Sequence, residues 1–342
     1  MSGNMKVLRA GPGVTLQDKG RPGWLDSGLS RGGAVDLLAL TEGAVLLGQS
    51  DHLPAVEMAG MGGEFEADSD LRIALTGAPM RAMLDGMKLA WNASHRWPAG
   101  TRLSIGGPVT GSYGYLHVGG GFEGTSRLGA CSAHLAAGIG SAVKAGDHLG
   151  VSDDPGGQAG MTLDVADRFS GGTVRIVESL QTNLFPQAER DRFTTTTFHR
   201  DVRGNRMGAR LVPPEEGFHT EGGRTVLSEV VVPGDIQITG DGTPFVLLCE
   251  CQTTGGYPRI GTVLPCDLPI IAQAPAGAPL RFQFIELDHA VEVERKAAIA
   301  RKALVQSIIP LIRDPHSIPD LLSYQLISGV TAGGDRTDED QR

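Results

Sequence analysis

Residues 245–263 read Phe-Val-Leu-Leu-Cys-Glu-Cys-Gln-Thr-Thr-Gly-Gly-Tyr-Pro-Arg-Ile-Gly-Thr-Val, two apolar runs on either side of a polar loop. The runs, Phe245–Cys251 and Arg259–Val263, have the length and composition of β-strands. The loop 252–258 places an amide, two hydroxyls and a phenol beside a glycine pair. A tight turn alone does not require this combination, and loops at strand ends commonly hold polar ligands. The stretch therefore predicts two strands joined by a ligand-binding loop.

The same rhythm of short apolar runs and turn residues extends outward in both directions. The sequence has 49 glycines among 342 residues, roughly twice the average share, without a collagen-like period. Further strands are predicted at Lys6–Ala10, Ala55–Ala59, Glu64–Ala67, Leu71–Leu75, Met80–Leu84, Leu103–Ile105, Tyr113–Val118, Val174–Glu178, Arg206–Leu211, Val226–Val232, Asp235–Ile238 and Leu280–Glu286. Helices are predicted at Asp36–Leu47, Thr182–Arg192, Glu292–Ile309 (ended by Pro310) and Asp320–Ile327. This pattern indicates a mainly β protein of antiparallel barrels with a few helices.

The length of 342 residues is typical of about two domains. The polar, glycine-rich stretch Ser152–Gly160 is the best linker candidate. We therefore predict one β-barrel half over residues 1–155 and a second over 156–289. A helical extension is expected over 290–330 and a disordered tail over 331–342.

Charge and composition exclude several classes of partner. The net charge of −9 disfavours nucleic acid and anionic membranes, since both require a basic surface. No run of 18 apolar residues is present, and residues 1–6 lack the apolar core of a signal peptide, so we expect a cytoplasmic protein. Four cysteines and nine scattered histidines show neither a disulfide framework nor metal-ligand spacing, so no metal site is expected.

Three further clusters carry chemistry. Asp18 and Arg21, three residues apart in a Gly/Pro loop, either bind a polar ligand or tie the loop together. The glycine pair within Ser30–Asp36 precedes a predicted helix, so it forms either an anion site or a plain turn with an N-cap. Arg206, between Gly204 and Gly208, either contacts a ligand or forms a buried ion pair.

Taken in order, these motifs resemble those of the biotin-dependent carboxyltransferase-domain family, which includes the C subunits of 5-oxoprolinases and KipA-like proteins (allophanate hydrolase subunit 2-like, urea amidolyase-related). The resemblance covers about residues 6–287 and is carried by Leu16–Gly23, Gly32–Asp36, Leu75–Ala78, Asn205–Leu211, Gln252–Val263 and Asp267–Gln273. The chain departs from the family pattern at residues 129–133, Gly-Ala-Cys-Ser-Ala, where an arginine and two hydroxyls are missing. It also has Glu250 where the family usually has aspartate, and Gln49 where it has asparagine.

The resemblance implies two packed cyclophilin-like β-barrels. It also implies one component of an ATP-dependent 5-oxoprolinase, a hydrolase that opens the lactam of 5-oxoproline to give glutamate. The expected partners are the LamB/YcsF-like A subunit, the KipI-like B subunit and a small amide substrate. ATP is expected to bind through the assembled complex, because this chain has no nucleotide motif.

The resemblance also assigns roles to individual residues. Arg21 and Arg206 would anchor a carboxylate or a phosphorylated intermediate, and Asp18 or Glu250 would act as general base or orient a water. Thr253, Thr254 and the backbone of the glycine pair would hold the amide, and Tyr257 would close the pocket. The full set of expected substrate-binding residues is Gln17, Met207, Gln237, Thr253, Thr254, Gly255, Gly256, Tyr257 and Gln273.

Two alternatives stay open. One is the carboxyltransferase of a urea carboxylase/allophanate hydrolase system, which would use carboxybiotin presented in trans. The other is a non-catalytic regulator that binds a KipI-like protein, an interpretation favoured by the side chains missing at residues 129–133.

Overall fold

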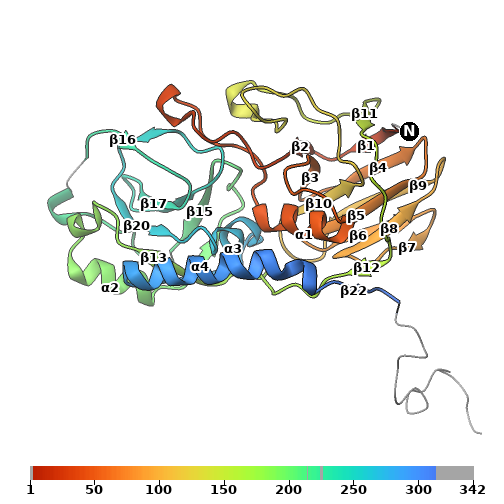
Figure 1. Cartoon of the computed structure of the whole chain (residues 1–342). Helices are drawn as coiled ribbons and strands as arrows, with labels where there is room; N and C mark the ends of the chain where they lie inside the picture. The colour runs from red at the N-terminus through yellow and green to blue at the C-terminus, as the bar shows by residue number, and fades with distance from the viewer. Residues whose placement is uncertain (1–2, 214, 224–225, 313–342) are drawn as a thin grey trace, which may run out of the picture.

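The first half of the chain forms two sheets around one apolar core (Figure 1). We describe residues 3–213, 215–223 and 226–312 of a computed structural model. In spatial order, one sheet contains β11 (His148–Val151), β1 (Gly3–Ala10), β4 (Gly63–Ala67), β9 (Arg102–Pro108), β6 (Met80–Leu84) and β7 (Met87–Lys88). The other contains β2 (Thr15–Gln17), β3 (Ala55–Ala59), β10 (Tyr113–Val118), β5 (Leu71–Gly77), β8 (Ala93–Trp97), β12 (Met161–Thr162) and β22 (Ile309–Pro310). Alternate residues of β1, β4 and β6 are buried, as the two-residue period of a half-buried strand requires.

The second half is a closed barrel of seven strands. Their order is β13 (Gly172–Val177), β20 (Arg259–Val263), β17 (Asp235–Ile238), β18 (Pro244–Leu247), β15 (Gly208–Val212), β14 (Phe198–Arg200) and β21 (Pro279–Phe284), and the parallel pair β13–β21 closes it. Phe193, Phe198, Phe218 and Phe282 fill one end of the core, with ring centroids 4.9–5.6 Å apart. The short strands β16 (Glu229–Val230) and β19 (Thr254–Gly255) pair outside the barrel. The mainly β fold predicted from the sequence is therefore confirmed, and the boundaries at 155 and 289 stay predictions.

The described residues include four α-helices and five short 3-10 turns. They are α1 (Leu37–Leu47), α2 (Gln187–Thr195), α3 (Leu268–Gln273) and α4 (Leu287–Ala303), with 3-10 turns η1 (Leu25–Ser27), η2 (Leu135–Ala137), η3 (Thr182–Leu184), η4 (Glu221–Gly223) and η5 (Leu304–Gln306). The α1 prediction is confirmed, with Asp36 as its N-cap. The prediction of one helix over Thr182–Arg192 was wrong, because Pro186 separates η3 from α2.

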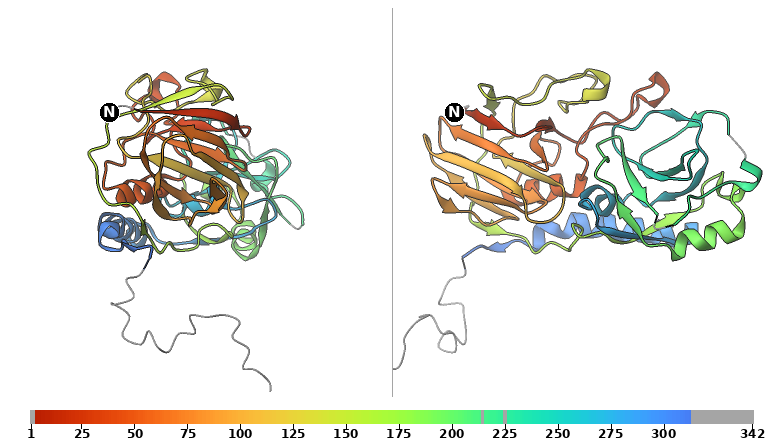
Figure 2. Two further views of the ribbon diagram at one scale, coloured as in Figure 1. Left: turned by 90° about the vertical axis from the view of Figure 1, so that its right-hand side faces the viewer. Right: turned by 180° about the vertical axis from the view of Figure 1, so that it is seen from behind.

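The C-terminal helix differs from its expected bounds of Glu292–Ile309. It begins five residues earlier and ends at Ala303, before Pro310, because the chain turns through η5 into β22, which pairs with β12 of the first half. As Figures 1 and 2 show, α4 runs beneath both halves. The expected helix Asp320–Ile327 and the tail 331–342 lie outside the described residues.

Two expected strands are shorter than the sequence indicates. The run Val226–Val232 contributes only β16, and the run Phe245–Cys251 leaves the barrel after Leu247. The strand Phe245–Cys251 ends early because the chain turns after Leu247, where Cys251 N–H donates to Leu248 C=O at 3.0 Å. This turn releases Glu250 from the strand and directs its backbone N–H to Arg206 C=O, 3.0 Å away.

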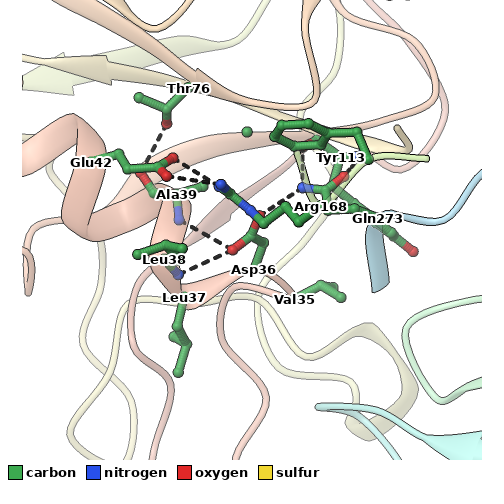
Figure 3. A network of polar contacts seen from close by, with 12 residues as sticks. Val35, Asp36, Leu37, Leu38, Ala39, Glu42, Thr76, Tyr113, Arg168 and Gln273 are labelled. Carbon is green, nitrogen blue, oxygen red and sulfur yellow. Dashed lines mark hydrogen bonds and ion pairs between the residues drawn. The ribbon is translucent and has the colours of Figure 1, made fainter. Parts of the chain in front are cut away.

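A buried charge network joins the two halves (Figure 3). Arg168 contacts Asp36 through Nε at 2.8 Å and both oxygens of Glu42 through Nη1 and Nη2, each at 2.8 Å. Gln273 of α3, which is 0% exposed, donates to Asp36 Oδ2 at 2.8 Å and to Tyr113 C=O at 2.9 Å, and its Oε1 accepts the Tyr113 N–H. We call Asp36, Glu42, Arg168 and Gln273 the interface tie. Its contacts fix the barrel against α1 and β10.

Candidate functional site

The loop after β2 carries the first predicted cluster. Asp18 Oδ1 accepts the Gly20 N–H at 2.8 Å and Oδ2 accepts the Cys131 N–H at 2.6 Å, so each carboxylate oxygen is held by a backbone amide. Gln17, fully buried, donates to Thr15 Oγ1 at 2.9 Å and Ala133 C=O at 3.1 Å, and its Oε1 has no partner. Asp18 thus shapes the loop, which is one of the two alternatives left open by the sequence.

Arg21, in the same loop, is a buried cation without an ion-pair partner among the described residues. Its side chain is buried, with the residue 1% exposed. Nε donates to Arg127 C=O at 3.3 Å and Nη2 donates to Ser132 C=O, whereas the buried Nη1 has no partner. Among the described residues, no carboxylate lies within ion-pair distance of this guanidinium. Burial lowers the pKa of Arg21, and the nearby charges of Asp18 and Glu250 oppose that shift.

The segment that departs from the family pattern contacts this loop through its backbone. Cys131 N–H binds Asp18, Ser132 C=O binds Arg21, and Ala133 C=O binds Gln17. Because main-chain groups make these contacts, they do not depend on the arginine and hydroxyls that residues 129–133 lack. Arg127 and Ser132 also line a hollow of about 380 Å³.

The glycine turn within Ser30–Asp36 does not leave the N-terminus of α1 free for an anion. Asp36 Oδ1 accepts the N–H groups of Leu38 and Ala39 at 3.1 and 3.2 Å, so the N-terminus of α1 is capped by its own carboxylate. The N–H groups of Val35 and Asp36 are bound by Glu57 and by the Tyr115 hydroxyl, both at 3.0 Å. The amides at the start of α1 are therefore not free to bind an anion, and the N-cap expected at Asp36 is confirmed.

Arg206 joins the two halves at the same place. Nε donates to Glu250 Oε1 at 2.8 Å, Nη1 to Glu57 Oε1 of β3, and Nη2 to Gly33 C=O at 2.6 Å. The negative charges of Glu57 and Glu250 hold the pKa of Arg206 well above its usual value despite burial. The buried ion pair, one of the two alternatives for Arg206, is thus present. It fixes Glu250 beside the first half of the molecule.

The loop 252–258 forms a flap over the barrel. β19 pairs with β16, and Thr253 C=O accepts the Val231 N–H at 3.0 Å. Gln237 lies buried beneath the flap, with Oε1 accepting from Gln252 at 3.4 Å and Nε2 unpartnered. A Cβ at position 255 would lie 2.3 Å from that Nε2, so a larger residue there would displace the Gln237 amide. The flap and Gln237 thus form one unit.

The remaining predicted residues are dispersed. Thr254, Gly256 and Tyr257 are exposed, and Tyr257 is 47% accessible rather than packed over a closed pocket. Met207 is 39% exposed beside Arg206. Gln273 lies apart, in the interface tie.

The sequence analysis missed Ser30 and His134 as site residues. Both are buried, and Ser30 Oγ lies 2.9 Å from His134 Nε2. Burial lowers the pKa of His134, as do Arg21 and Arg206, while Glu250 raises it. The charged side chains of Arg21, Arg206 and Glu250 therefore lie close enough to His134 to affect its pKa. No sequence signal links Ser30 to His134 because 104 positions separate them.

The site includes no cluster of metal-binding side chains. Within residues 3–213, 215–223 and 226–312, no group of three or more His, Cys, Asp or Glu side chains is arranged to hold a metal ion. In the same residues, no helix has the length and apolar character needed to cross a membrane.

Comparisons with known proteins show the family to which the chain is similar. Residues 27–284 match the family model "Carboxyltransferase domain, subdomain A and B". The chain is 33% identical over 295 residues to the C subunit of 5-oxoprolinase from Escherichia coli, covering 85% of this chain and 94% of that protein. It is 30% identical over 290 residues to the Haemophilus influenzae protein of the same name, covering 84% and 93%.

A solved structure supports the fold. The Kluyveromyces lactis urea carboxylase superimposes with a TM-score of 0.78 at 22% identity, covering 91% of this chain and 31% of that enzyme. The chain therefore spans less than a third of that enzyme, and the similarity shows the fold alone.

Proposed function

Since the chain belongs to the carboxyltransferase-domain family, we propose that it is the C-subunit-like component of an ATP-dependent 5-oxoprolinase. Both bacterial relatives that carry the C-subunit name match it over more than nine-tenths of their length. That name supports an enzyme component that works with other subunits. For these we propose a LamB/YcsF-like A subunit and a KipI-like B subunit.

The observation that carries the proposal is the placement of Glu250. Arg206 holds its Oε1 at 2.8 Å, and among the described residues no donor is bound to Oε2. Such a carboxylate can accept a proton from a water that attacks a lactam carbonyl, or orient that water. Asp18 has both oxygens engaged by backbone amides, so we assign the base role to Glu250.

The other groups serve binding. Arg21, with a buried nitrogen left unpaired, is the group available for a substrate carboxylate or a phosphorylated intermediate. Arg206 is engaged by Glu57 and Glu250, so we assign it to positioning Glu250. Gln237 and the flap 252–258 supply amide and hydroxyl groups for the lactam.

We assign ATP binding to a partner protein rather than to this chain. The glycine turn before α1 is the feature closest to a phosphate cradle, and Asp36 already occupies its amides.

The test is coupled ATP hydrolysis and glutamate release from 5-oxoproline in the complex with both partners, omitting each protein in turn. We expect activity to vanish without this chain. Glu250→Gln, which keeps the size and the Arg206 contact, is expected to lower kcat by about 10²-fold. Glu64→Gln, on the outer face of β4, is the matched control and is expected to leave kcat unchanged. Full activity of Glu250→Gln would remove Glu250 from the reaction.

Absence of turnover in the complete mixture would favour the alternatives. Carboxybiotin-dependent carboxylation of urea would then indicate a carboxyltransferase. Binding to the KipI-like protein without any turnover would indicate a regulator. The contacts made by the backbone of residues 131–133 weaken the regulator interpretation, because the site loop keeps its support despite the missing side chains.

A further inference from the structure

Gly32 packs closely against Arg21 and His134. A Cβ at position 32 would sit 3.1 Å from His134 Cδ2 and 3.4 Å from Arg21 Nη1. Position 32 has φ +60°, which favours glycine. Any larger side chain at position 32 would therefore press against the His134 ring and the buried, unpartnered Nη1 of Arg21.

The hydrogen bonds of His134 leave the Ser30 hydroxyl as a second donor near Arg21. Its Nδ1 accepts the Ala137 N–H at 3.3 Å, so the ring proton lies on Nε2 and is donated to Ser30 Oγ at 2.9 Å. The Ser30 hydroxyl accepts that proton and keeps its own O–H for another acceptor. Among the described residues, no acceptor for that O–H is found. Ser30 is 4% exposed and His134 3%, so this donor is buried as well.

The unmet groups are donors, and among the described residues no carboxylate lies within ion-pair distance of Arg21. Asp18 binds two backbone amides, and Glu57 and Glu250 bind Arg206. Arg21 is left without a counter-ion, and a buried guanidinium is strongly stabilised by a carboxylate. A carboxylate offers two acceptor oxygens, one for Arg21 Nη1 and one for the Ser30 hydroxyl.

We infer that Arg21, Ser30, Gly32 and His134, here called the arginine cradle, bind the carboxylate of the substrate and so select a carboxylate-bearing lactam over a neutral amide. The inference rests on the proposed function and adds Ser30, Gly32 and His134 to the specificity-determining residues. His134 acts as a positioning residue, since its Nε2 proton orients the Ser30 hydroxyl. The charged groups around it are Arg21, Arg206 and Glu250.

The test is calorimetric titration of the purified full chain with 5-oxoproline and with pyrrolidin-2-one, the same lactam without a carboxylate. We expect 5-oxoproline to bind at least about 10-fold more tightly, as loss of a charge-assisted hydrogen bond implies. Gly32→Ala is expected to remove this preference by crowding Arg21 Nη1 and the His134 ring. Gly28→Ala is the matched control, because Gly28 has φ +78° and nothing within 4 Å of an added Cβ. Ser30→Ala and the exposed Ser27→Ala form a second matched pair.

A positional role for His134 has its own readout. His134→Ala is expected to weaken 5-oxoproline binding, and His134→Asn, which keeps an N–H donor, to restore part of it. Equal binding of the two lactams, no binding of either, or equal effects of Gly32→Ala and Gly28→Ala would each overturn the cradle.

The same variants in the complete complex separate this inference from the proposed function. Turnover with an unchanged KM in Gly32→Ala would overturn the cradle and leave the proposed function standing. If the complete complex showed no turnover but still bound 5-oxoproline more tightly than pyrrolidin-2-one, the proposed function would be overturned and the cradle would stand.

Discussion

Two regions each combine an arginine with a histidine–hydroxyl pair, and they differ in what is left unsatisfied. Beneath the interface tie, His117 Nε2 contacts Thr76 Oγ1 at 2.8 Å, and Thr76 donates to Ala39 C=O of α1 at 2.8 Å. Arg168 donates to two carboxylates there. In the arginine cradle, Arg21 keeps an unpaired nitrogen and Ser30 an unused O–H. A saturated polar network stabilises a fold, whereas buried donors without partners mark a place for a ligand.

The largest effect is expected from removing the cation of the interface tie. Arg168→Met leaves Asp36 and Glu42, 0% and 2% exposed, without their counter-ion. Breaking such a buried pair is expected to lower the free energy of unfolding by about 3–5 kcal/mol. Urea denaturation at neutral pH measures it. A loss below about 1 kcal/mol would erase the distinction between the tie and the cradle.

A second effect concerns pH. Burial lowers the pKa of His117 to about 3, well below the ordinary value of 6.5. Below about pH 6.5, His117 becomes protonated in the unfolded chain, whereas in the folded chain it stays neutral until about pH 3. The contribution of His117 to the free energy of unfolding is therefore complete above pH 6.5 and is lost as the pH falls. Between pH 6.5 and 5 this linkage predicts a loss of about 2 kcal/mol.

Denaturation curves at several pH values check this prediction. His117→Asn is the control, since it removes the titrating group and should flatten this part of the pH dependence. A wild-type slope that persists in His117→Asn would assign the loss to other groups.

The sequence predicts Asp36 of the tie and Arg21 of the cradle, but it singles out neither Arg168 nor His134, for physical reasons. The position of Asp36 before an apolar helical period identifies an N-cap, which is a local property. Alternation within short runs likewise predicts strands such as Ala55–Ala59. The contact of Ser30 with His134 depends on packing across 104 positions, and no local pattern encodes it. Glu250 shows a different limit, since a local turn between Leu248 and Cys251 removes it from its predicted strand.

Replacing Arg21 is expected to cost far less stability than replacing Arg168. Arg21→Met removes hydrogen bonds to two carbonyl groups but also a buried charge that has no counter-ion, so we expect unfolding free energy to change by about 1 kcal/mol or less. Binding of 5-oxoproline should nevertheless be lost. Urea denaturation and calorimetry on the same preparation test both parts. A stability loss equal to that of Arg168→Met would mark Arg21 as a structural residue.

The smallest effect is expected at the surface. Glu64 bridges Arg9 and Arg102 on the outer face of the first half, where the two arginine side chains are 58% and 59% exposed. Water and salt screen such pairs, so Glu64→Gln should change the free energy of unfolding by no more than about 0.5 kcal/mol, and by less at high salt. Urea denaturation at low and high ionic strength measures it. A loss approaching that of Arg168→Met would mean that burial does not separate strong ion pairs from weak ones here. The contrast between tie and cradle would then need a cause other than desolvation.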